Sequence, residues 1–74
     1  MKRTKFVTGF KDTNNGDKIR QVVQVDITDL TKDLGSKFLF VEVEQHDGDR
    51  VYREQISLPV KAIKKLIKAI RKVA

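Results

Sequence analysis

The first three quarters of the chain alternate between hydrophobic and polar side chains, with the period of two that is typical of β-strands. Four segments show this alternation, and they predict strands over residues 5–11, 18–28, 37–45 and 50–58. Turn-forming residues fill the gaps at 12–17 and 46–49, and the first of these turns contains an Asn-Gly pair that suits a tight turn. The gap at 29–36 is expected to be a loop with one helical turn ended by Gly35.

Two of these strands separate their side chains into two faces. In the second strand, Ile19, Gln21, Val23, Val25 and Ile27 share one face, and Arg20, Val22, Gln24, Asp26 and Thr28 share the other. We therefore expect one buried and one accessible surface on the sheet. In the third strand, Leu39, Val41 and Val43 oppose Phe38, Phe40, Glu42 and Glu44. The aromatic end of that second face needs a partner, either the core, a neighbouring subunit or a ligand.

The pattern changes to a helical one after the fourth strand. An apolar stripe recurs at spacings of three and four and consists of Val60, Ile63, Leu66, Ile67, Ile70 and Val73. This spacing predicts an amphipathic helix over residues 59–73. Pro59 suits the first helical position, and Ser57 is a candidate cap. Residues 1–74 are thus expected to form one α+β domain, a four-stranded antiparallel β-meander followed by one C-terminal helix.

The net charge of +6 is concentrated in that helix. The last sixteen residues contain no acid and six cations, which are Lys61, Lys64, Lys65, Lys68, Arg71 and Lys72. Residues 1–58 hold ten basic and ten acidic side chains and are neutral overall. A surface with such a concentration of one charge attracts polyanions.

The size of the chain limits its stability and suggests an oligomer. A core built from 74 residues supplies only a few kcal/mol, and the chain has no Cys for a disulfide or a zinc site. We therefore expect a dimer or a higher assembly. No apolar run approaches the roughly 20 residues that span a bilayer, and no signal peptide is recognisable. These features predict a cytoplasmic protein.

The chain offers little for catalysis. His46 is the only His and is expected in a turn, facing solvent. Asp47 and Asp49 flank a Gly but lack the further ligands of a calcium loop. Glu42 and Glu44 could form a carboxylate pair, although pairing with Lys or Arg across the strands explains them better. We expect no enzyme activity, no cofactor and no metal site.

The basic helix allows three interpretations. Its cationic side could simply face water, it could bind phosphates, or the helix could lie on a membrane surface. Its apolar stripe consists of aliphatic residues without Trp or Phe, which suits packing on a sheet rather than membrane insertion. We therefore expect no membrane partner.

The sheet provides a second candidate surface. All five aromatic residues, Phe6, Phe10, Phe38, Phe40 and Tyr52, fall on predicted strands. Strand aromatics can stack on unpaired bases while basic neighbours follow the nucleic-acid backbone. Most strand Phe residues belong to a core, so we expect about two of the five to be accessible.

The second half of the chain resembles a family of single-stranded-DNA-binding proteins. The resemblance covers residues 37–73 and consists of the strand Lys37-Phe38-Leu39-Phe40-Val41-Glu42-Val43, the turn His46-Asp47-Gly48-Asp49, and the step Gln55-Ile56-Ser57-Leu58-Pro59 into an amphipathic helix. These features are similar to the positive cofactor four transcriptional coactivator family, which is related in fold to the Whirly proteins.

The resemblance implies a homodimer formed through the helix and single-stranded DNA bound along the sheet. It makes eight residues candidates for nucleic-acid contacts: Lys5, Phe10, Lys11, Lys18, Arg20, Arg50, Tyr52 and Arg53. We therefore expect a nucleic-acid-binding protein that favours single-stranded DNA or RNA. Two alternatives stay open, namely duplex phosphate binding by the six helix cations and a non-enzymatic module that docks an acidic protein partner.

Overall fold

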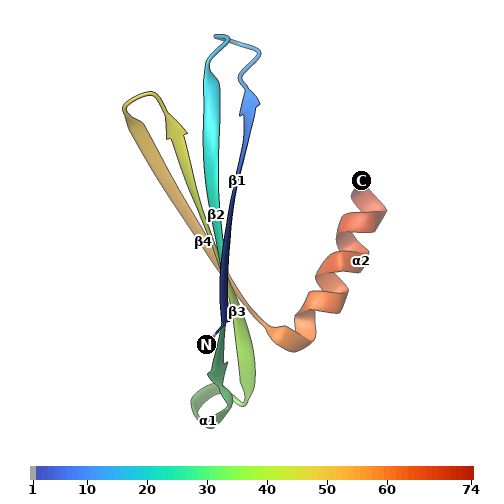
Figure 1. Ribbon diagram of the computed structural model, residues 1–74. Helices are drawn as coiled ribbons and strands as arrows, with labels where there is room; N and C mark the ends of the chain where they lie inside the picture. The colour runs from blue at the N-terminus through green and yellow to red at the C-terminus, as the bar shows by residue number, and fades with distance from the viewer. Residues whose placement is uncertain (1) are drawn as a thin grey trace.

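The computed structural model describes residues 2–74 and shows one sheet followed by a helix (Figure 1). Within these residues the strands are β1 (Lys2–Lys11), β2 (Lys18–Leu30), β3 (Ser36–Asp47) and β4 (Arg50–Pro59). A short helix α1 (Thr31–Leu34) connects β2 to β3, and a 3₁₀ turn (Val60–Ala62) leads into α2 (Ile63–Val73). The predicted α+β architecture is confirmed.

Each strand pairs antiparallel with its neighbour in sequence, so the sheet order is β1-β2-β3-β4. The register is continuous along each pair, with Lys11 opposite Lys18, Arg20 opposite His46, and Glu44 opposite Arg53. Because side chains alternate across a strand, this register assigns each strand residue to one of two faces.

We call these surfaces the apolar face and the polar face. The apolar face carries Phe6, Phe10, Ile19, Val23, Val25, Ile27, Leu39, Val41, Val43, Tyr52, Ile56 and Leu58. The polar face carries Lys5, Lys18, Arg20, Gln24, Asp26, Glu42, Glu44 and Arg53, together with Phe38 and Phe40. The faces predicted for the second and third strands are therefore confirmed.

The connection between β3 and β4 is shorter than the sequence predicts. His46 and Asp47 belong to β3, and only Gly48 and Asp49 form the turn. A two-residue hairpin loop with Gly first, here at a φ of 60°, has the pattern of a type II′ turn, whose twist matches that of the flanking strands. The prediction of a solvent-facing turn histidine is thus wrong, because the tight turn places His46 within the sheet.

The helix begins later than predicted. Pro59 has φ −61° and ψ 141°, which is extended, and it still pairs with Phe38 at the end of β4. Proline fixes φ but leaves ψ free, so it can end a strand as well as begin a helix. Ser57 lies within β4, and no side chain caps the turn that follows. The turn ended by Gly35, with φ 75° in the left-handed region, is as predicted.

Helix α2 stands away from the sheet, as Figure 1 shows, and the 3₁₀ turn before it, Val60–Ala62, is the part that packs near β3. The exposed fraction along its apolar stripe rises from 37% at Leu66 to 43% at Ile67, 53% at Ile70 and 87% at Val73. Among the side chains that the structure describes, Ile19 is the one buried hydrophobic residue, with 6% exposed. A single chain therefore has almost no core.

Candidate nucleic-acid interface

The eight sheet candidates are all exposed, but the register distributes them over both faces. Phe10, Arg50 and Tyr52 lie on the apolar face. Five cations lie on the polar face, and these are Lys5, Lys11, Lys18, Arg20 and Arg53. The sequence pattern did not separate the two groups, because a face is assigned across strands by register and not along one strand.

Four of the eight candidates meet in one hollow at the turn end of the β1–β2 hairpin. It has a volume of about 370 Å³ and is lined by Thr8, Gly9, Phe10, Lys11, Lys18, Ile19 and Arg20. We call it the hairpin hollow. Gly9 is required here by close packing, because a Cβ at this position would lie 2.8 Å from the carbonyl oxygen of Ile19. The hollow thus joins an aromatic ring to three cations.

The cations of this hollow have no acidic partner. Lys11 lies directly opposite Lys18, and like charges at such positions repel each other. Within residues 2–74, neither lysine nor Arg20 takes part in an ion pair, and the same is true of Lys5. A bound anion would relieve this repulsion, so the hairpin end is suited to hold a phosphate.

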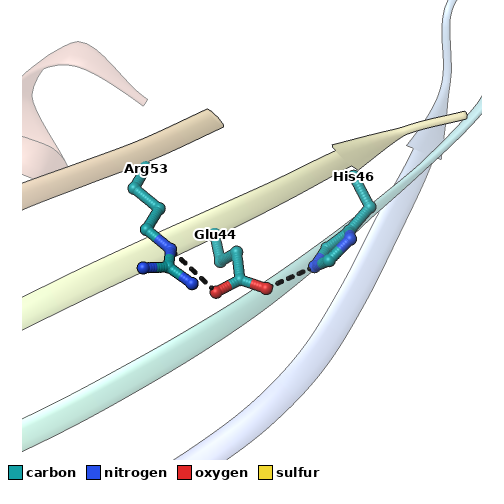
Figure 2. A network of polar contacts seen from close by, with 3 residues as sticks. All are labelled: Glu44, His46 and Arg53. Atoms are coloured by element: carbon teal, nitrogen blue, oxygen red, sulfur yellow. Dashed lines mark hydrogen bonds and ion pairs between the residues drawn. The ribbon is translucent and has the colours of Figure 1, made fainter. Parts of the chain in front are cut away.

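The middle of the polar face is charge-compensated instead. Figure 2 shows Glu44 between Arg53 and His46: its Oε2 accepts a hydrogen bond from Arg53 Nε at 3.1 Å, and its Oε1 lies 2.6 Å from His46 Nε2. Asp26 forms a second ion pair, with Arg3 Nε at 2.8 Å. Both of these arginines, Arg3 and Arg53, are therefore engaged by acids and are less available to a ligand.

The hydrogen bond from His46 is the main reason that the pKa of Glu44 lies below its usual 4.5, and the charge of Arg53 acts in the same direction. A carboxylate whose pKa is lowered in the folded state stabilises the fold above its unfolded pKa. That stabilisation is lost as the pH falls through the folded value.

Replacing this carboxylate should therefore flatten the acid limb of the stability curve. In Glu44→Gln, the loss of melting temperature below about pH 4.5 is expected to be smaller than in wild type, as measured by circular dichroism. Glu42→Gln is the matched control, because Glu42 forms no ion pair within residues 2–74. Identical acid limbs for wild type and Glu44→Gln would contradict the expectation.

The apolar face becomes polar towards the hairpin ends. One row across the sheet consists of Thr8, Gln21, Gln45 and Tyr52, which lie opposite one another on successive strands. Gln21 Nε2 donates a hydrogen bond to Gln45 Oε1 at 3.2 Å. Sequence reasoning missed this amide pair, because its members are 24 residues apart and only the register brings them together.

A second hollow lies beside this row. It has a volume of about 320 Å³ and is lined by Val43, Gln45, Tyr52 and Glu54, all on the apolar face. We call it the tyrosine hollow. It places an amide and a carboxylate beside a candidate aromatic residue.

The aromatic residues of the polar face lie at the other end of the sheet. Phe38 and Phe40 are half-buried, and their ring centroids are 6.5 Å apart. They pair with Thr28 and Asp26 of β2, far along that strand from Arg20. The three remaining aromatics, Phe6, Phe10 and Tyr52, are each about half exposed, so the expected number of two was too low.

The helix cations form a separate surface. All six are exposed, and the five on α2 lie within an arc of about 120° at the ordinary 100° per residue. The apolar stripe occupies the opposite side of the helix. No acid lies on the 3₁₀ turn or on α2, so this arc carries positive charge that its own element does not compensate.

Comparison with known proteins identifies no relative. No family model matches the chain, and no match is found among the curated proteins or among the solved structures. In the part of the chain that the structure describes, no helix is long and apolar enough to cross a membrane. Residues 2–74 also contain no cluster of three His, Cys, Asp or Glu side chains that could hold a metal ion.

Proposed function

We propose that this chain is a cytoplasmic nucleic-acid-binding protein, without enzyme activity, that favours single strands. The observation that carries the proposal is the hairpin hollow, which Phe10 lines together with Lys11, Lys18 and Arg20. Unpaired bases stack on exposed aromatic rings, and unpaired cations neutralise the phosphates that link them. A duplex presents its phosphates but keeps its base faces stacked, so it would use only the cations.

The test is fluorescence anisotropy with a labelled single strand and its duplex. If Lys5, Lys11, Lys18 and Arg20 each contact one phosphate, the logarithm of the binding constant for a single strand should fall against the logarithm of the salt concentration with a slope of roughly −2.8. The single strand should bind more tightly than the duplex. An affinity that stays constant between about 50 and 200 mM salt would exclude this mechanism.

The basic arc of α2 supports a second candidate, which is duplex phosphate binding. The supporting observation is that no acid compensates this arc within its own element. Charge reversal at Lys64, Lys68 and Arg71 separates the two surfaces. Retained single-strand binding would assign the site to the sheet, whereas lost binding would assign it to the helix. A protein that binds neither nucleic acid at moderate salt would instead be a module for an acidic protein partner.

The proposed working form is a homodimer. A single chain exposes 6302 Å², whereas a compact protein of this mass exposes about 4,700 Å². The excess of about 1,600 Å² per chain is what an obligate homodimer buries on each partner. The radius of gyration of 15.2 Å likewise exceeds the value of about 11 Å for a compact chain of this length.

The apolar stripe of α2 and the sheet end nearest to it are the surfaces that such a dimer would cover. Ile56 and Ile70 are each 53% exposed, which is unusual for aliphatic residues on an amphipathic face. In a two-fold dimer the same patch serves both chains, so each helix and each sheet would be covered once. The hairpin ends lie at the far end of the strands and would stay accessible.

A further inference from the structure

We propose, building on the function above, that the tyrosine hollow holds one unpaired nucleobase of the bound strand, stacked on the ring of Tyr52. The hollow is the space of about 320 Å³ on the apolar face between Val43, Gln45, Tyr52 and Glu54. Nothing in the described part of the single chain fills it, and Tyr52 is 49% exposed. An exposed ring beside an aliphatic side chain is the stacking environment that single-strand-binding proteins use.

The polar groups of the hollow fit the edge of a base. Gln45 Oε1 accepts the hydrogen bond from Gln21, and this leaves Gln45 Nε2 as a donor on a residue that lines the hollow. Glu54 provides a carboxylate that accepts hydrogen bonds. Every nucleobase carries an N–H donor next to an acceptor on its pairing edge, so the donor of Gln45 and the acceptor of Glu54 can serve any of them.

The same pair of groups explains why the base must be unpaired. In a duplex the pairing edge is already hydrogen-bonded to the opposite strand, and recognition of that edge requires a base splayed out of the helix. Gln21 is a positioning residue in this arrangement, because its Nε2 donates to Oε1 and so holds the Gln45 amide in place.

Charge decides between a base and a phosphate as the occupant. The carboxylate of Glu54 in the wall repels a phosphate but accepts a base N–H. Arg50 lies two residues before Tyr52 on the same face, is exposed, and forms no ion pair within residues 2–74. A strand whose base enters the tyrosine hollow would thus place a phosphate near Arg50, and the hairpin hollow on β1 and β2 would hold further phosphates.

The chain provides its own probe for this proposal. It contains one Tyr and no Trp, so its intrinsic fluorescence comes from Tyr52 alone. Stacking of a base on a phenol ring quenches that emission. The experiment titrates the full chain with a single-stranded oligonucleotide and with an abasic oligomer of equal length, which keeps the phosphates and lacks the bases. Anisotropy reports binding, and tyrosine emission reports the base.

The expected result is that the intact oligonucleotide quenches Tyr52, whereas the abasic oligomer binds more weakly and leaves the emission unchanged. Binding of both oligomers without quenching, or equal quenching by both, would overturn the base pocket but leave nucleic-acid binding in place. Absence of binding by either would overturn the proposed function, and the pocket with it.

Two substitutions of the ring complete the test by anisotropy. Tyr52→Ala should weaken binding of the intact oligonucleotide by about tenfold, the ordinary loss for one stacked base, and leave the abasic oligomer unaffected. Tyr52→Phe is the matched control, since it retains the ring and should bind nearly as wild type. An equal loss of both oligomers in Tyr52→Ala would show a structural role for the ring and contradict the pocket.

Discussion

Replacing Ile70 with aspartate is expected to abolish the proposed dimer and, with it, the folded state. Ile70 lies at the centre of the apolar stripe as measured around the helix axis, and it is 53% exposed in the single chain. Loss of a buried Ile side chain costs about 2–5 kcal/mol per copy, and a two-fold interface incurs this cost twice. A buried, unpaired carboxylate adds to it. The sum is comparable to the whole stability of a small domain.

Light scattering during size exclusion measures this effect directly. Wild type should have twice the 8.5 kDa mass of one chain, and Ile70→Asp should lose both this mass and the β-sheet signal in circular dichroism. Lys68→Asp places the same new side chain on the opposite side of α2 and should leave the dimer intact. A wild-type chain that is folded and has the mass of one copy would refute the homodimer.

Lys18→Glu is expected to stabilise the protein and at the same time to weaken nucleic-acid binding. The substitution turns the Lys11–Lys18 repulsion into an attraction, worth about 0.2–1 kcal/mol for a cross-strand pair. It also removes a phosphate contact, which should reduce the salt slope by roughly 0.7, and the new negative charge repels the strand. A residue with a purely structural role would not move the two quantities in opposite directions.

The measurements are the melting temperature and the single-strand dissociation constant across a salt series. Lys32→Glu is the control with the same change in net charge, and Lys32 is an exposed residue of α1. It should weaken binding far less than Lys18→Glu. Equal losses for the two variants would mean that net charge, and not the hairpin hollow, determines binding.

The alternating pattern was sufficient to predict the strands, because each strand pairs with its sequence neighbour and turn residues lie between them. The spacing of three and four was likewise sufficient to predict the apolar stripe of α2. The ends of the elements were harder to predict. Pro59 is compatible with both a strand and a helix, and the sequence around His46 did not reveal that a two-residue turn would connect β3 to β4. Such choices depend on pairing across the hairpin.

Predicting the candidate site required the pairing register of the strands. Phe10 and Lys11 are adjacent in sequence, yet they point to opposite faces, and the hairpin hollow unites them only because β1 ends there. The tyrosine hollow joins residues from β3 and β4, and its amide is oriented by Gln21 from β2. No spacing along the chain encodes a row that runs across three strands.

The meander order has a consequence for how the chain assembles during synthesis. Since every strand pairs with the one made just before it, each hairpin can close as soon as its second strand has left the ribosome, and the contacts stay short in sequence. The helix that presents the apolar stripe follows the sheet along the chain and therefore emerges after it. We expect association to be the last and concentration-dependent step, so that a scarce chain spends longer as an open sheet than an abundant one.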